Sequence, residues 1–335
     1  MEYNLFTEIL FATIVAGTPL IITALGELVT EKSGVLNLGA EGTMAVGAIV
    51  AFAVTHHTHN PWFGVLAGIG AGMAMSLIFA VLALTMMANQ VASGLALSIF
   101  GMGLSAFIGK PYESEALAST APLRIPGLVN IPYIGPALFN QQILVYFSWI
   151  MLALVAWFLY KSKRGLTLRA VGESPVSAHD IGHPVIRIRY MATIFGGAMA
   201  GVGGAFMSVF YTPLWVEGMI AGRGWISLAL VVFATWRPLR VMIGAYLFGG
   251  VMVIGMFIQS SGLGGVPTWL MWLPSPLKLL VGWFIGQLQV IPAQFLSALP
   301  YAATIVVLVL ISRNLKTIRL NSPASLGQIF RADDA

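Results

Sequence analysis

The sequence predicts an all-α fold, a polytopic helical membrane protein in which broken or re-entrant segments interrupt the spans. Hydrophobic residues make up 58% of the 335 residues and charged residues only 9%, whereas soluble domains have about 45–50% apolar and about 25% charged residues. Apolar runs long enough to cross about 30 Å of hydrocarbon recur along the chain. A soluble core of this length could not bury so much apolar surface.

We expect about nine or ten transmembrane helices. Nine apolar runs lie near 6–28, 35–55, 61–87, 91–109, 142–160, 190–211, 224–236, 241–260 and 297–312. We interpret 277–292 as a re-entrant or interfacial piece, because one more crossing would move the C-terminus to the side opposite the basic segments. The first run lacks a basic n-region and an A-x-A-like site, so we expect a retained span.

Basic residues orient the predicted spans. Most of the 17 Lys and Arg residues fall in segment 161–189, in the turn after Phe233 and near the C-terminal end. The positive-inside rule therefore places these segments in the cytoplasm and the Pro- and Gly-rich loop 110–140 outside. We expect a transmembrane domain at 1–312 and a cytoplasmic tail at 313–335. This orientation signal explains the basic composition without nucleic acid.

Small residues recur at helical spacing in two of the runs. One stripe contains Gly64, Gly68 and Gly72, and a second contains Gly197 and Gly201. Small residues four apart let helix backbones approach closely within a membrane. We predict that both stripes serve helix packing.

The first candidate site is Thr30–Gly47, where a plain span would carry Leu and Val. It contains Asn37 and Glu41 among the glycines Gly34, Gly39 and Gly42. A carboxylate in a span costs about 2.5–3.5 kcal/mol on insertion scales, so it usually faces a cavity, a partner or a substrate. If the segment is helical, Asn37 and Glu41 share a face. They either line a translocation path, bond to neighbouring helices or, in the case of Glu41, brace unwound backbone.

The second candidate site is Glu217–Trp236. Its helix, starting near Gly224 after Arg223, has about 13 residues, which is short for a crossing of about 20 residues. Short, glycine-interrupted segments in both halves of a chain indicate broken helices at a midplane binding site. We therefore expect a pseudo-repeat of two halves on either side of 161–189, although the halves share no evident residue identity.

The third candidate site is the loop 165–185. Ser174 can cap a helix that has Pro175 in its first turn, and Gly182 can end it. The spacing predicts a short helix at Pro175–Ile181 outside the membrane. It either docks into another protein or forms a simple solvated turn.

Other motifs give no catalytic or metal site. His56, His57 and His59 have no nearby carboxylate or thiol to complete a ligand set, and we expect incidental imidazoles at a turn. The sequence has no GxxxxGK[ST] phosphate-binding loop and no HExxH. We predict neither enzymatic activity nor a bound cofactor or metal for this chain.

Four segments together resemble a known family. SGVLNLGAEGTMAVGA resembles the signature of ABC-importer permeases of the branched-chain amino acid and simple-sugar group, above all its nucleoside-type branch. GLTLRAVGESPVSAHDIGHPV resembles that branch's coupling segment, GRGWISLALVVFATWRPLR its second-half motif and IPAQFLSALPYAATIVVLVL its last span. The sequence departs from the pattern at 260–287, and Ala40 and Thr43 leave the ligand open.

The resemblance implies a permease subunit in the cytoplasmic (inner) membrane. It implies a pore shared with a second, homologous permease, an external solute-binding protein, and cytoplasmic ATPase subunits that use ATP and dock on Ser174–Ile181. The nucleoside branch implies a neutral solute rich in hydrogen-bonding edges. The candidate path residues are Asn37, Glu41 and Arg223, and the candidate coupling residues are Gly172, Glu173, Ser174, Pro175, Ala178 and Gly182.

Alternative functions remain open at this point. A permease of the same group could carry simple sugars or branched-chain amino acids. A stand-alone secondary transporter would use Glu41 or Glu217 as a carboxylate linked to proton or sodium movement. A membrane receptor or assembly protein would not transport at all. Copurification of an ATPase subunit separates the first class from the others.

Overall fold

The computed structural model describes residues 5–132, 134–260 and 321–331, together with Ala302, Ile305 and Val309. Eleven α-helices make up most of these residues, which confirms the all-α prediction. They are α1 (Leu5–Lys32), α2 (Ala40–Thr58), α3 (Pro61–Ala80), α4 (Gln90–Gly109), α5 (Ile134–Phe139), α6 (Ile143–Lys161), α7 (Lys163–Glu173), α8 (Pro175–Asp180), α9 (Val185–Ala205), α10 (Arg223–Phe233) and α11 (Pro238–Ser260).

Short elements complete the described chain. The π-helical turns η1 (Val81–Thr85) and η4 (Phe206–Tyr211) continue α3 and α9. Loop 110–140 contains the 3₁₀ turns η2 (Lys110–Tyr112) and η3 (Leu128–Asn130) as well as α5. Its strand β1 (Leu123–Arg124) pairs in antiparallel fashion with β2 (Asn140–Gln141).

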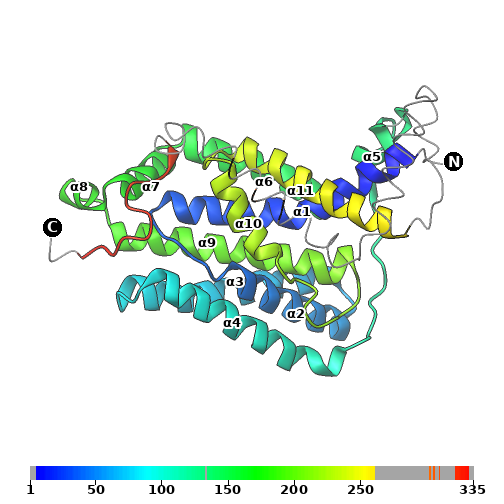
Figure 1. Ribbon diagram of the computed structural model, residues 1–335, viewed down its shortest axis with the longest axis horizontal. Helices are drawn as coiled ribbons and strands as arrows, with labels where there is room; N and C mark the ends of the chain where they lie inside the picture. Colours follow the sequence, from blue (N-terminus) through cyan, green and yellow to red (C-terminus); the bar gives the residue numbers. More distant parts are fainter. Residues whose placement is uncertain are drawn as a thin grey trace.

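The long helices lie side by side along the longest axis of the molecule (Figure 1). Helix α1 packs against α9 and α11, and α2 packs against α3, α4 and α9. Helices α7 and α8 and the C-terminus lie at one end, whereas α5 and the N-terminus lie at the other (Figure 1). The basic segment 161–189, which contains α7 and α8, and the loop 110–140, which contains α5, are thus at opposite ends of the bundle.

Six helices among the described residues are long and apolar enough to cross a membrane: Thr7–Lys32, Pro61–Thr85, Gln90–Tyr112, Ile143–Lys161, Val185–Tyr211 and Pro238–Met256. They match six of the nine predicted runs. The run 35–55 is helical only from Ala40, and most of α2 is buried within the bundle. The run 224–236 forms α10, which has only 11 residues. The predicted pieces 277–292 and 297–312 lie outside the described residues.

Local sequence explains where several helices begin. Asn60 caps α3 by accepting the Trp62 N–H at 2.9 Å, and Asn89 caps α4 by accepting the Ala92 N–H at 3.0 Å. Such caps satisfy N–H groups that have no partner within the helix. Pro61 follows Asn60 at the first helical position, where its missing N–H costs nothing.

The glycine stripes serve helix packing, as predicted. A Cβ at Gly72 of α3 would lie 3.0 Å from the Gly201 Cα of α9. A Cβ at Gly68 would lie 3.1 Å from the Gly47 carbonyl oxygen of α2. Side chains at these positions would push the three helices apart.

Candidate functional site

A buried carboxylate holds the N-terminus of the short helix α10. Glu41, in the first turn of α2, is 1% exposed. Its Oε1 accepts the Gly222 N–H at 2.6 Å, and its Oε2 accepts the N–H groups of Gly224 at 2.7 Å and Trp225 at 3.2 Å. One side chain therefore satisfies three backbone donors of an element far away in sequence.

Elementary helix physics explains why an acid lies here. The first N–H groups of a helix have no acceptor within the helix, and the N-terminus carries a partial positive charge. Inside a membrane protein, water is scarce and cannot replace the missing acceptors. The glycines allow the close approach: Gly222 has φ +82°, and a Cβ at Gly224 would lie 2.5 Å from the Glu41 Cα.

A tight turn positions Glu41 at the start of α2. Asn37 is 2% exposed, and its Oδ1 accepts the Gly39 N–H at 2.8 Å. The helix begins at Ala40, so Asn37 precedes it and the two residues do not share a helix face. Gly42 lets α4 approach, because a Cβ there would lie 2.7 Å from the Ser98 Cα.

Arg223, the first residue of α10, lies beside the Glu41 contact. Its Nη1 donates to the Met219 carbonyl oxygen at 2.6 Å, and its guanidinium lies 6.0 Å from the centre of the Tyr211 ring. Both Arg223 and Tyr211 are partly exposed. The structure thus brings Glu41 and Arg223 to one helix end, while Asn37 braces the turn that leads to it.

A second carboxylate contacts the residues that follow α10. The indole N–H of Trp236 donates to Glu31 Oε2 at 2.6 Å, and Glu31 is 2% exposed. The chain turns here through Thr235 and Trp236, which have φ values of 48° and 52°. One turn earlier on α1, Glu27 is 1% exposed, and its Oε2 has no hydrogen-bond partner among the described residues.

The predicted extramembrane helix forms as α8. Ser174 caps it by accepting the Ser177 N–H at 3.3 Å, Pro175 lies in its first turn, and Gly182 with φ +88° follows it. The helix ends at Asp180, one residue before the predicted end. The remaining coupling candidates differ in exposure: Gly172 and Ala178 are buried, whereas Glu173 is exposed.

Comparison with known proteins assigns the family. The family model described as "branched-chain amino acid transport system / permease component" matches residues 9–281. The chain belongs to this family. A Haloferax volcanii protein provisionally named as a glucose ABC transporter permease is 40% identical, over 97% of this chain and 98% of its own length.

Two further relatives of the permease have names that refer to nucleosides. The guanosine ABC transporter permease protein of Bacillus subtilis is 35% identical, over 76% of this chain and 81% of its own length. The nucleoside ABC transporter permease protein of Lactococcus lactis is 32% identical, over 89% of this chain and 90% of its own length. The family and the six apolar helices identify a multi-pass membrane protein.

Among the described residues of this permease, sequence reasoning missed the burial of Glu27, Glu31 and Arg189. Glu27 and Glu31 could have been found as acids four residues apart, on one face of an otherwise apolar helix. Arg189 was counted with the basic segment that sets orientation, but it lies within α9 and is 1% exposed. The positive-inside pattern alone does not distinguish a buried arginine from a solvated one.

The histidine turn forms an aromatic cluster. His57 Nε2 lies 2.9 Å from the Tyr112 hydroxyl, and the His56 ring lies 5.6 Å from the Tyr112 ring. Among the residues that the structure describes, no group of three or more His, Asp or Glu side chains is arranged to hold a metal ion. His56 and His57 therefore contact the aromatic ring of Tyr112 in η2, at the end of the bundle opposite α8.

Proposed function

We propose that this chain is the transmembrane permease subunit of a binding-protein-dependent ABC importer for a nucleoside, driven by ATP hydrolysis in a separate ATPase subunit. The observation that carries the proposal is the Glu41 contact: a helix of 11 residues starts inside the bundle, with its N-terminus held by a buried carboxylate. Broken helices of this kind occur at midplane solute sites of transporters.

The candidate path residues then have different roles. Glu41 accepts three backbone N–H groups, so it braces the start of α10 and does not itself contact the solute. Asn37 braces the turn before α2. Arg223 and Tyr211 are partly exposed at the same helix end and supply donors and an aromatic face to the solute. A neutral nucleoside would be recognised by such groups without a paired charge.

The coupling candidates support docking of a cytoplasmic ATPase subunit. The capped helix α8 lies at the basic end of the bundle, which the positive-inside rule assigns to the cytoplasm. Closure of an ATPase dimer would move α8 and its neighbours Gly172 and Glu173. The transporter would lie in the cytoplasmic (inner) membrane of the cell, and a second, homologous permease would complete its pore. An external solute-binding protein would deliver the solute at the end of the bundle opposite α8.

The solute class has a second candidate. The guanosine and nucleoside relatives support a nucleoside. The Haloferax relative, with its 40% identity over nearly the whole chain, supports glucose or another simple sugar. The donors of Arg223 and the partly exposed ring of Tyr211 suit both classes, because nucleosides and simple sugars are both neutral and carry hydroxyl groups.

Uptake measurements test the proposal. Uptake is compared in cells with and without this chain, with the neighbouring genes intact. Uptake of labelled guanosine is measured with unlabelled glucose as competitor, and uptake of labelled glucose with unlabelled guanosine as competitor. We expect guanosine uptake to be lost without the chain and to be unaffected by glucose. Loss of glucose uptake alone would assign the sugar. Uptake by the purified chain without an ATPase subunit, driven by a proton or sodium gradient, would establish a secondary transporter instead.

A further inference from the structure

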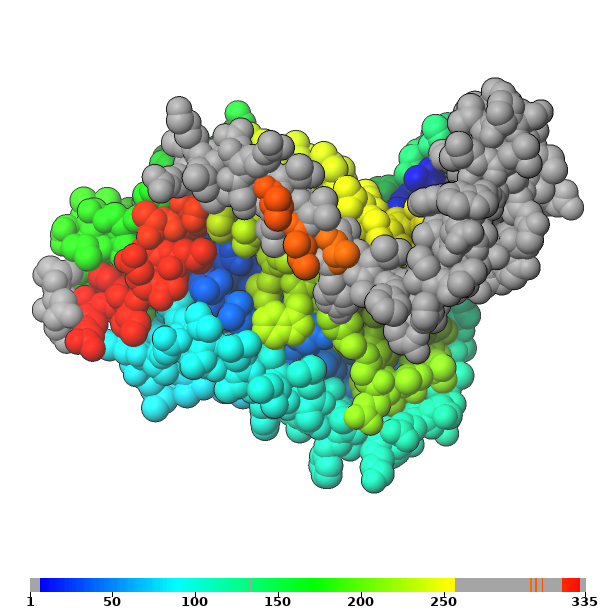
Figure 2. Space-filling view, in the orientation of Figure 1, coloured from blue at the N-terminus to red at the C-terminus, as the bar shows by residue number. Residues whose placement is uncertain are grey.

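We call the C-terminal residues Asn321–Arg331 the strap. The strap is hydrogen-bonded to the end of the bundle that carries α7 and α8. In Figure 2 the strap, in red, lies directly beside these green helices. Lys32 Nζ donates to the Asn321 carbonyl oxygen at 2.5 Å, and the Gly327 N–H donates to the Gly34 carbonyl oxygen at 3.1 Å. The strap therefore contacts both the end of α1 and the connection to α2.

The strap also bonds directly to the last turn of α7. The Ser325 N–H and hydroxyl both donate to the Gly172 carbonyl oxygen, at 3.0 and 2.7 Å. A Cβ at Gly34, where φ is +89°, would lie 2.5 Å from the Ser325 Oγ. Glycine is therefore required where the strap, α7 and the α1–α2 connection meet.

Buried Arg189 joins these segments. Its guanidinium donates to the Ser33 carbonyl oxygen at 3.2 Å, to Ser325 Oγ at 3.1 Å and to the Gln328 carbonyl oxygen at 3.2 Å. A buried charge is tolerated when its donors are satisfied in this way. Two of the three acceptors belong to the strap, so the strap has a defined position on α9.

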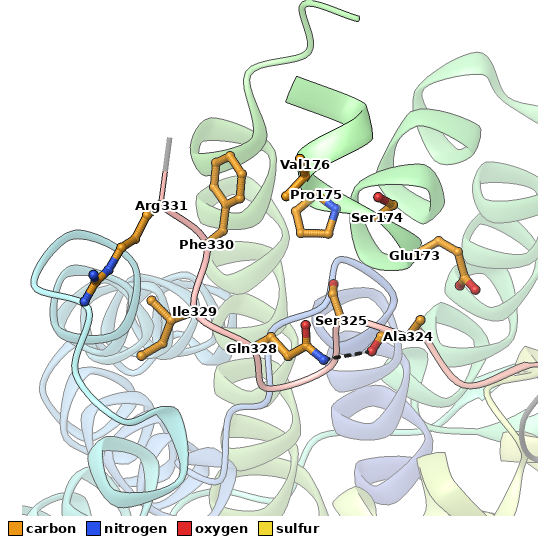
Figure 3. A pocket seen from close by; sticks show the side chains of 10 residues that line it. All are labelled: Glu173, Ser174, Pro175, Val176, Ala324, Ser325, Gln328, Ile329, Phe330 and Arg331. Atoms are coloured by element: carbon orange, nitrogen blue, oxygen red, sulfur yellow. Dashed lines mark hydrogen bonds between the residues drawn. The ribbon is translucent and has the colours of Figure 1, made fainter. Parts of the chain in front are cut away.

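A groove of about 590 Å³ lies between the strap and the coupling segment. Figure 3 shows Pro175 and Val176 on one side and Ile329 and Phe330 on the other. Phe330 anchors the strap, since it packs with the buried side chain of Ala178 and lies 5.7 Å from the His179 ring. The groove therefore has walls from two segments that are far apart in sequence.

The groove has the character of a protein-binding surface. Val176 and Ile329 lie on facing walls of the groove and are 45% and 47% exposed. Such exposure of apolar side chains is unexpected here, because both residues lie outside the candidate spans, at the end of the bundle that carries the basic segment 161–189. Exposed apolar side chains around a hollow that lies outside the candidate spans favour a contact with another protein. Exposed Glu173 on the lining favours a basic group on the partner. The wall that contains Val176 is α8, the helix already proposed to dock the ATPase subunit.

We propose that the strap and α8 form one docking surface for the ATPase subunit, which places an apolar side chain in the groove and a basic one beside Glu173. This inference rests on the proposed function, because it adds a second wall to the coupling contact. The strap also bonds to Gly34 and, through Arg189, to Ser33, both in the connection that leads to Glu41. Movement of the docked ATPase subunit is thereby transmitted to the start of α2 as well as to α7.

Single cysteines test the surface, since the natural sequence has none. We compare Ile329→Cys and Val176→Cys with Leu123→Cys, a control of matched exposure (48%) in the loop at the opposite end. Each variant of the assembled transporter is labelled with a benzophenone maleimide and irradiated, and cross-linked products are identified by mass. We expect cross-links to the ATPase subunit from positions 329 and 176 and none from position 123.

The outcomes separate the two proposals. A cross-link from position 176 without one from position 329 would overturn the strap surface and leave the proposed function standing. A cross-link from position 329 alone would contradict docking on α8 and would therefore overturn the joint surface. Cross-links from neither position would overturn both.

A charge in the groove gives a second readout. We expect Ile329→Glu to weaken binding of the purified ATPase subunit to permease-containing nanodiscs about tenfold, as for a central interface residue, while Leu123→Glu leaves it unchanged. Unchanged binding by Ile329→Glu would contradict the strap surface.

Discussion

The two ends of α10 are held by different means. At its N-terminus, three backbone N–H groups depend on Glu41, which comes from another helix. At its C-terminus the backbone closes on itself: the N–H groups of Thr235 and Trp236 donate to the carbonyl oxygens of Val232 and Val231 at 2.9 and 3.1 Å. Glu31 adds only a side-chain contact, from the Trp236 indole.

This difference shows which end of a half-length helix needs a partner. Left-handed residues let a helix end satisfy its own last carbonyl groups. The first N–H groups have no such local solution unless a side chain just before them can cap the helix. Here the residue before α10 is Gly222, which has no side chain to offer. The N-terminus of α10 therefore depends on α2, and changes there should have the larger effects.

Removal of the Glu41 carboxylate should have the largest effect. Each buried N–H left without an acceptor costs about 1–3 kcal/mol, and Glu41→Ala leaves three of them. We expect uptake by the reconstituted transporter to fall at least tenfold, while the complex still assembles. Glu41→Gln, which keeps an acceptor oxygen, should fall between Glu41→Ala and wild type.

Glu8→Ala is the matched control, because Glu8 is an exposed acid on α1. It should keep wild-type uptake. Wild-type uptake by Glu41→Ala would show that α10 does not need its carboxylate partner.

A methyl group at Gly224 should have the next largest effect. Its Cβ would lie 2.5 Å from the Glu41 Cα and 2.6 Å from the Glu41 backbone nitrogen, so α10 must move away from α2. We expect Gly224→Ala to lower both uptake and the melting temperature of the purified complex. Gly103→Ala in α4, where a Cβ meets no atom within 4 Å among the described residues, should leave both unchanged or raise the melting temperature slightly. Equal melting temperatures for the two variants would argue against close packing at Glu41.

Loss of the Trp236 indole N–H should have a smaller effect. Trp236→Phe removes one donor to Glu31 and leaves the backbone closure of α10 in place. We expect a loss of about 1–3 kcal/mol in stability, seen as a lower melting temperature, with uptake reduced less than in Glu41→Ala. Trp157→Phe, at an indole that is 60% exposed on α6, is the control and should have no effect. A greater loss of uptake in Trp236→Phe than in Glu41→Ala would reverse the ranking of the two ends.

The sequence predicted what depends on local or periodic pattern. Six of the nine apolar runs, the glycine stripes and the cap at Ser174 appear among the described residues as predicted, because their partners lie within a few residues or recur at helical spacing. The polar, glycine-rich segment around Glu41 was also singled out from the sequence, and its role as a functional site stays a prediction.

The remaining features depend on contacts that no local pattern encodes. The donors to Glu41 lie 181 to 184 residues further along the chain, so the sequence could not choose between a path-lining acid and a brace. The conditional expectation that Asn37 shares a helix face with Glu41 does not hold, because its side chain stabilises a turn before α2. Arg189 looks like an orientation charge until its acceptors at Ser33 and in the strap are seen.

The smallest effect is expected at Glu217, the other acid near α10. Glu217 is exposed in the loop that precedes the helix and accepts no N–H of its first turn, in contrast to Glu41. We expect Glu217→Gln to keep wild-type uptake at every pH tested, because an exposed acid can be neutralised without leaving a buried donor unsatisfied. A proton-coupled secondary transporter that uses Glu217 would instead lose its pH dependence and its accumulation of solute. The measurement is uptake across a pH series in proteoliposomes, with and without ATP. It therefore shows whether Glu217 only lies near the start of α10 or couples proton movement to transport.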